Sequence, residues 1–292
     1  MGIIDEIKQN FKQGNNLIKL IYINIGVFLL ANISLLFISF SNRDLAEQIQ
    51  NPWFSFPSNL NMLLLKPWTI ITYMFYHVDI WHIVFNLIFF YWFGQIFLQY
   101  LDNKKLVGVY LLGGISGAIV FSIAFNFYQS ATGINFNGIL FGASAAIMAV
   151  AIAISAIVPN YSLNMLFIGP VKLKYIALFY IVLDIISINR ENPGGHIAHL
   201  GGALFGYIFA VQYKNGKDLT KGLNSFLDGL SSLFKFKRKM KVTYQKPFSD
   251  FDYNKQKIDN QKEMDRILDK IAKGGYESLT KEEKNFLFRS SK

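Results

Sequence analysis

Long runs of apolar residues dominate this chain and set the strongest limit on its fold. Six runs approach the length of about 20 residues that a helix needs to cross a bilayer. Charged residues make up only 16% of the 292 residues, below the roughly 25% that is typical of soluble domains. The sequence therefore predicts an all-α polytopic membrane protein with six transmembrane helices. We place these helices at Leu17–Phe40, Trp81–Leu101, Leu106–Tyr128, Ile139–Val158, Tyr175–Ile188 and His196–Tyr213.

Basic residues in the connections predict the orientation of these helices. They precede the first run, occur between the second and third (Lys104, Lys105) and between the fourth and fifth (Lys172, Lys174), and follow the sixth. The alternate connections hold few, and residues 129–138 hold none. We therefore expect an integral, multi-pass protein of the cell (inner) membrane with both termini in the cytoplasm. The second, fourth and sixth helices then begin at the outer surface.

Three segments follow from this arrangement: a cytosolic N-terminal segment at 1–16, a membrane domain at 17–213 and a basic cytosolic tail at 214–292. The tail holds 19 Lys and Arg residues against 11 Asp and Glu residues. Such a surplus suits a segment beside anionic lipid. It lacks the interleaved aromatic residues that single-strand binders use, so nucleic acid is not a predicted partner.

A small helical hairpin is expected near residues 259–288 of the tail. Apolar residues recur at helical spacing in 259–272, and Gly274-Gly275 ends that run. Thr280 and Glu283 then form the pattern of a capping box that opens a second helix. We expect a linker from Phe234 to Tyr253 before the hairpin.

Three short motifs carry the candidate chemistry. Ser144 stands between small residues near the start of the fourth helix, and His82 and Asn86 share one face of the second. His199 lies beside a stripe of small residues in the sixth helix (Ala198, Gly202 and Gly206) that would allow a close helix crossing. At a rise of about 1.5 Å per residue, Ser144, His82 and His199 all lie within a turn or two of the outer surface. Spacing alone also allows a purely structural role, in which these residues only hold the helices together.

A metal or haem site is a second possibility for four histidines on two helices. There is no HExxH motif, no carboxylate follows His196 or His199, and the chain has no cysteine. We therefore predict no metal and no cofactor. Asp184 is an acid deep in a predicted span, where carboxylates often serve a function. It could orient His199 as a third catalytic residue, but we interpret it as a residue near the outer end of its helix within reach of water.

The combination of these motifs resembles the rhomboid intramembrane serine proteases. It consists of His77 and His82-x-x-x-Asn86 opening one helix, Gly142-x-Ser144 opening another, and His199-x-x-Gly202-x-x-x-Gly206 in the last. The resemblance covers residues 17–213 with six helices in the expected order. It implies a rhomboid-like fold, to which the small helical cytosolic extension is added.

The resemblance also implies a function and roles for the site residues. The chain would be a serine endopeptidase with Ser144 as nucleophile and His199 as general base, without a catalytic acid. His82 and Asn86, with the Ser144 N–H, would stabilise the oxyanion. The implied substrates are membrane-spanning proteins, cut near the outer surface of the lipid bilayer. His77, His196 and Met148 are secondary site candidates.

Two positions depart from the family pattern. Ala145 follows the nucleophile where the family usually has glycine, and Met148 stands where members often carry an aromatic ring over the base. Neither change removes a catalytic group. The alternative hypothesis is a catalytically inactive relative that binds transmembrane helices. A third hypothesis is a histidine-lined transporter or metal carrier.

Overall fold

The computed structural model describes residues 9, 11, 13–41, 53–134, 138–165, 168–190, 192–234 and 250–290. The chain forms two compact units, Met1–Lys235 and Phe236–Lys292, which are treated separately below. The predicted linker lies mostly outside the described residues, as does most of the predicted N-terminal segment.

Six helices of the first unit overlap the six predicted ones, but the fourth begins at Ser144 and not at Ile139, which lies in a strand. Within the described residues, four are long and apolar enough to cross a membrane. They are α2 (Asn16–Ser41), α6 (Ile80–Tyr100), α7 (Asn103–Thr132) and α10 (Pro193–Lys214). The other two, α8 (Ser144–Ile157) and α9 (Leu173–Ser187), are shorter. The mostly helical membrane fold is confirmed, and six complete crossings stay a prediction.

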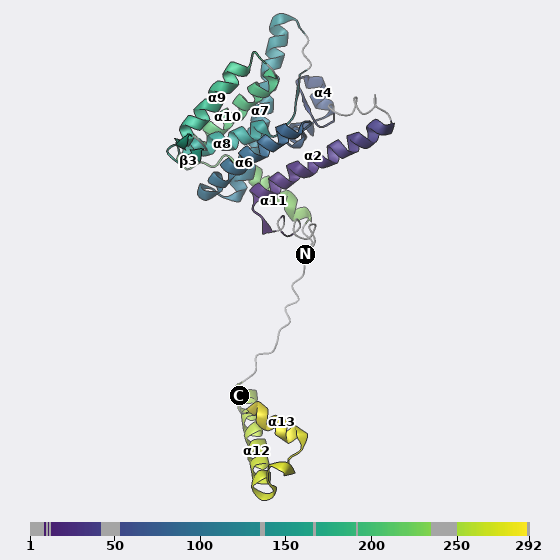
Figure 1. The fold of residues 1–292 in the computed structure, drawn as a ribbon, viewed down its shortest axis with the longest axis vertical. Coiled ribbons are helices and arrows are strands. Elements are labelled where there is room, and N and C mark those ends of the chain that lie inside the picture. Colours follow the sequence, from purple (N-terminus) through teal and green to yellow (C-terminus); the bar gives the residue numbers. More distant parts are fainter. Residues whose placement is uncertain are drawn as a thin grey trace. The chain divides into compact units, whose positions relative to one another are not determined.

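The short helix α8 is the core of this unit. It packs against α6, α7 and α10, and α9 lies along α10 (Figure 1). Every residue from Ala145 to Ser155 is buried. A helix that is apolar on all sides has no face to offer to water, so it is stable only where neighbours surround it. The sequence of α8 therefore places Ser144 at the edge of the most enclosed helix.

Short elements connect these helices. Residues 56–75 carry β1 (Phe56–Pro57), α4 (Leu60–Leu65), α5 (Thr69–Thr72) and the 3-10 helix η1 (Tyr73–Phe75). Strand β1 pairs antiparallel with β2 (Ile139–Leu140), with Phe56 opposite Leu140. A second antiparallel pair, β3 (Ser162–Met165) with β4 (Gly169–Lys172), joins α8 to α9. The first pair ties the chain before α6 to the segment that enters α8.

A further helix, α11 (Lys221–Phe234), belongs to the first unit and was not predicted. It packs on α7, where Lys104 Nζ lies 2.6 Å from Asp228 Oδ2. Apolar residues recur in it at 223, 226, 227 and 230, which is the helical spacing that would have revealed it. The structural boundary therefore falls after α11, at residue 235, and not at residue 214 where the composition changes.

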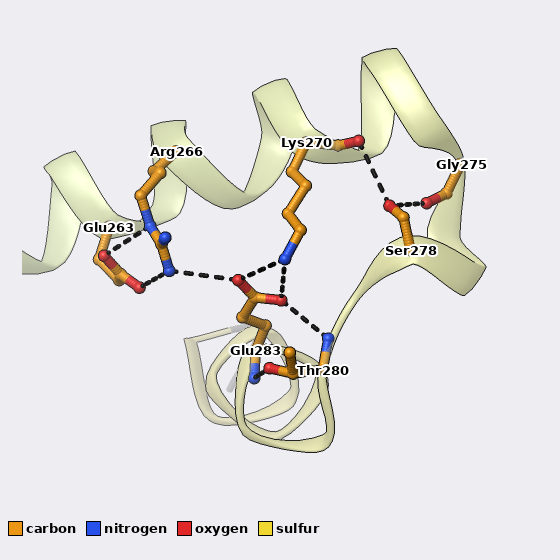
Figure 2. A network of polar contacts seen from close by, with 7 residues as sticks. All are labelled: Glu263, Arg266, Lys270, Gly275, Ser278, Thr280 and Glu283. Atoms are coloured by element: carbon orange, nitrogen blue, oxygen red, sulfur yellow. Dashed lines mark hydrogen bonds and ion pairs between the residues drawn. The ribbon is translucent and has the colours of Figure 1, made fainter.

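The second unit contains the two predicted helices of the hairpin. Helix α12 (Asp250–Gly274) begins earlier than predicted and is followed by the 3-10 helix η2 (Tyr276–Ser278) and by α13 (Lys281–Ser290). The capping box is confirmed: the Thr280 N–H donates to Glu283 Oε2 at 2.8 Å, and the Glu283 N–H donates to Thr280 Oγ1 at 3.4 Å. Figure 2 shows that Glu283 also faces Arg266 and Lys270 of α12.

Candidate active site

The loop before α8 positions its first residue, Ser144. Gly142 has a φ of +102°, a left-handed value that favours glycine, and its N–H donates to the Tyr73 carbonyl at 2.9 Å. A Cβ at Gly142 would lie 2.6 Å from Cε1 of His82, so the missing side chain also makes room for that imidazole. Because the first N–H groups of a helix have no acceptor within it, those of Ser144 and Ala145 have no partner within α8.

Two glycines of α10 allow it to cross α8 at close range. A Cβ at Gly202 would lie 2.0 Å from the carbonyl oxygen of Ala145, and one at Gly206 would lie 2.3 Å from that of Ala149. A side chain at either position would push the helices apart. The predicted close crossing of the fourth and sixth apolar helices is therefore confirmed.

The methyl group of Ala145 fits into this packing. A Cβ at Gly117 of α7 would lie 2.7 Å from the Ala145 Cβ, so the absence of a side chain at Gly117 leaves the space that the methyl occupies. Ala145 is buried. The departure from the family pattern at this position thus leaves the start of α8 without a clash.

The first turns of α10 carry His196 and His199. Asn192 begins the helix with its Oδ1 accepting the Gly195 N–H at 3.1 Å, and Pro193 occupies the first turn, where its missing N–H costs nothing. The two histidines are three residues apart, so their side chains project from the same face. That face meets α9.

One carboxylate oxygen of Asp184, in α9, lies within hydrogen-bond distance of both imidazoles. Its Oδ1 lies 2.7 Å from Nδ1 of His196 and 2.8 Å from Nδ1 of His199. The Asp184 side chain is only 8% exposed. The interpretation of Asp184 as a residue apart from His199 is therefore wrong. Asp184 lies near the end of α9 and the histidines near the start of α10, so a short connection brings them to the same depth.

Asn86 and His77 are linked beneath the start of α8. The buried His77 donates from Nδ1 to the Phe75 carbonyl at 3.4 Å, and its Nε2 accepts the Ala143 N–H at 3.2 Å. The Asn86 amide nitrogen lies 3.4 Å from the same Nε2. His77 thus fixes the backbone directly before Ser144, a contact that no sequence spacing indicated.

His82 occupies the first turn of α6. Asp79 caps this helix, and its Oδ1 accepts the His82 N–H at 2.8 Å. The His82 ring lies 5.2 Å from the His77 ring, centroid to centroid, and is half-buried. Because the helix begins here, the imidazole is held at the same end of the bundle as Ser144.

One cavity of about 900 Å³ joins these side chains. Phe85, Phe89, Trp92 and Tyr180 contribute aromatic walls to it. Six of the seven residues predicted for the site line the cavity, and so does Asp184. The six are Ser144, His199, His82, Asn86, His196 and Met148. The seventh, His77, does not line it. The hydroxyl of Ser144 forms no hydrogen bond within the part of the chain that the structure describes, so it is free to meet a ligand.

Met148 packs between α8, α9 and α10. It is buried and forms a small apolar cluster with Ile152 and Ala203, against which Tyr180 packs. The site where family members often carry an aromatic ring is therefore filled by a thioether at the cavity wall.

Comparison with known proteins gives a family match in each of the two units. The family model of the Rhomboid domain matches residues 65–215, and a family of unknown function (DUF6576) matches residues 250–292. RHOMBOID-like protein 12, mitochondrial, of Arabidopsis thaliana is 31% identical over 159 residues. That match covers 51% of this chain and 47% of the relative, so the similarity extends over about half of each protein.

The Rhomboid match begins just before α5 and ends with α10, so it contains every residue that lines the cavity. It covers more than half of the chain, and the four long apolar helices agree with an integral membrane protein. This chain belongs to the rhomboid family.

Proposed function

We propose that this protein is an intramembrane serine endopeptidase in which Ser144 is the nucleophile and His199 the general base. One observation carries the proposal: Ser144, at the open N-terminus of α8, and His199 line a single cavity together with His82 and Asn86. A serine hydroxyl is a weak nucleophile until a neighbouring base removes its proton. The close crossing of α8 and α10 supports this pairing.

Asp184 gives His199 the tautomer that a base needs. A carboxylate oxygen only accepts hydrogen bonds, so the 2.8 Å contact assigns the hydrogen to Nδ1 of His199. Nε2 then keeps its lone pair and can accept the proton of Ser144. In the second half of the reaction the same nitrogen returns the proton to the leaving amine. The proposed site therefore contains an orienting carboxylate in addition to the serine and histidine.

The start of α8 supplies the stabilisation of the oxyanion. The N–H of Ser144 points out of the first turn without an intrahelical acceptor, and the positive end of the helix favours negative charge there. His82 and the Asn86 amide add side-chain donors from α6. Such donors act strongly because they are fixed in advance and shielded from bulk water. His77 holds both Asn86 and the preceding backbone in place.

The apolar walls of the cavity and its place within the helices suit membrane-spanning proteins as substrates. Under the orientation expected from the basic connections, the cavity lies toward the outer surface, where water reaches the serine. Both termini and the second unit are then cytoplasmic, and the membrane is the cell membrane. Our proposed organisation keeps the three segments 1–16, 17–213 and 214–292, with the start of the tail, including α11, belonging to the first compact unit.

Labelling with a fluorophosphonate probe tests this function. The full chain in detergent should react, and Ser144→Ala should abolish the reaction. His199→Ala should slow it by at least about a hundredfold. Ser187→Ala is the matched control, because this hydroxyl lines the same cavity but has no assigned role. Cleavage of a reconstituted single-span substrate should follow the same order.

Two results would overturn the proposal. One is labelling that persists in Ser144→Ala. The other is a folded native chain that neither labels nor cleaves, which would instead identify a helix-binding relative without catalysis.

A further inference from the structure

Three potential metal ligands converge in the cavity that Ser144, the proposed nucleophile, also lines. The carboxylate of Asp184 and the imidazoles of His196 and His199 each offer one ligand atom, and these atoms all lie within 4.8 Å of one another. The two histidines come from one helix face and the carboxylate from its neighbour, so two helices build the cluster. The sequence argued against a metal because no acid follows the histidines, but Asp184 supplies the acid from α9.

We propose that Asp184, His196 and His199 bind a divalent transition-metal ion of the Zn²⁺ type, and that the bound ion switches off the base His199. The regulatory half of this proposal rests on the proposed protease function. The binding half does not, because it depends only on the three ligands.

The ligand set has the chemistry that such an ion prefers. Two imidazoles and one carboxylate leave a fourth position open, as in zinc sites that also hold water or a substrate. Zinc at about 2.0–2.1 Å from each nitrogen and oxygen places tetrahedral ligands about 3.3 Å apart. The present Nδ1–Oδ1 distances are 2.7 and 2.8 Å, which are hydrogen-bond lengths. Small side-chain shifts would therefore convert the hydrogen-bonded cluster into a coordinated one.

Electrostatics also favour a cation at this point. Asp184 is a buried carboxylate, and among the described residues no lysine or arginine forms an ion pair with it. A buried carboxylate is stable only when hydrogen bonds, an opposite charge or a metal compensate it. The two imidazole side chains are 25% and 22% exposed and line the cavity, so an ion can reach them.

Metal binding would act on catalysis through the tautomer of His199. An ion bound to Nδ1 takes the lone pair of that nitrogen, so the hydrogen of the neutral ring moves to Nε2. Nε2 then has no lone pair with which to accept the proton of Ser144. When Asp184 accepts a hydrogen bond from Nδ1, His199 is ready to act as a base. When Asp184 and Nδ1 instead bind the same metal ion, His199 cannot act as a base.

Cobalt titration tests the binding half. Purified full chain, stripped with a chelator, should take up one equivalent of Co²⁺ and develop the visible absorption of a tetrahedral site. Zn²⁺ should displace it. His196→Ala, His196→Gln and Asp184→Asn should each weaken binding at least about tenfold, since second-shell changes alone cost 10–100-fold. Ser187→Ala is the control in the same cavity. Absence of stoichiometric uptake by the native chain, or unchanged uptake in the folded His196 variants, would overturn the proposal.

Probe labelling of Ser144 tests the regulatory half. Zn²⁺ should suppress labelling of the native chain, a chelator should restore it, and the concentration for half suppression should match the binding constant. In the His196 variants the Zn²⁺ concentration for half suppression should rise at least tenfold. Suppression in each variant is expressed relative to the labelling rate of that variant without metal. Labelling that is insensitive to bound Zn²⁺ overturns the switch. A chain that never labels defeats the proposed protease function, while the cobalt titration still decides the metal site.

Discussion

Nδ1 of His199 lies 2.8 Å from Oδ1 of the buried Asp184, a carboxylate near the end of the preceding helix. The contact fixes which ring nitrogen carries the hydrogen and how the ring is turned. A Ser–His pair without an acid was expected, so the relation adds a positioning residue to the proposed site.

We predict that Asp184→Asn lowers kcat of substrate cleavage by at least about tenfold with little change in KM, because an amide can donate to Nδ1 and stabilise the wrong tautomer. Initial rates with a reconstituted substrate measure both constants. Asp102→Asn is the control: Asp102 caps α7 away from the cavity, and asparagine caps helices equally well. Equal rates for Asp184→Asn and the native chain would mean that His199 is held without Asp184.

His77 gives a second prediction, on stability. His77→Ala removes the acceptor of the buried Ala143 N–H and leaves that group unpaired, at a cost of about 1–3 kcal/mol before any cavity is counted. We expect a lower Tm in detergent together with lost activity. His82→Ala should lose activity with a much smaller fall in Tm, because His82 is half-buried at the cavity. Equal Tm values for the two variants would show that His77 does not hold the start of α8.

The sequence predicted the helices and six of the residues that line the cavity, because both depend on local signals, but it did not predict the aromatic walls. Apolar length located the long helices, and charge placement set Ser144 and His199 at one depth. The contact of Asp184 with His199 was considered but not predicted, because a run that is apolar on most sides does not reveal the rotation of its helix, which decides what each side chain contacts. The contact of His77 with Ala143 joins a loop to a helix start 66 residues away, and no periodicity encodes such a contact.

Backbone spacing between α8 and α10 gives a third prediction. Gly202→Ala puts a methyl 2.0 Å from the Ala145 carbonyl oxygen, so the helices must separate. We expect the free energy of unfolding to fall by about 3 kcal/mol, the upper end of the range typical of overpacking, or the chain to fail to fold. Gly229→Ala in α11 is the control, since a Cβ there meets nothing within 4 Å. Thermal unfolding in detergent compares them, and a native-like Tm for Gly202→Ala would contradict the close crossing.

The place where the membrane unit ends gives a fourth prediction. Helix α11 packs on α7 through Lys104–Asp228, and Thr220, the residue before α11, fills the space beside Gly108. A chain that stops after residue 235 should react with the probe at a rate within about twofold of the full chain, because a compact unit has its own hydrophobic core and can fold without the rest. A chain that stops after residue 214 loses these contacts and should unfold at a lower temperature. The idea fails if the shorter chain is as stable as the longer one.

The last prediction concerns Glu283 of the second unit. Its carboxylate accepts from the Thr280 N–H at 2.8 Å and from Lys270 Nζ at 2.9 Å, and these contacts lower its pKa from 4.5 to about 2. A carboxylate with a lowered folded pKa stabilises the fold at pH values above its unfolded pKa. That contribution disappears as the pH falls from about 5 toward 2. The hairpin of α12 and α13 should therefore lose stability over this acidic window.

Glu283→Gln isolates this effect, because glutamine keeps the shape of the capping box but not the charge. We expect the variant to melt at a lower temperature than the native hairpin at pH 7, and the two melting temperatures to converge as the pH approaches 2. Circular dichroism of residues 250–292 measures both curves. Glu282→Gln, one residue earlier and exposed, serves as the matched control and should follow the native curve. Parallel curves for Glu283→Gln and the native hairpin would show that the ion pairs with Lys270 and Arg266 do not stabilise the unit.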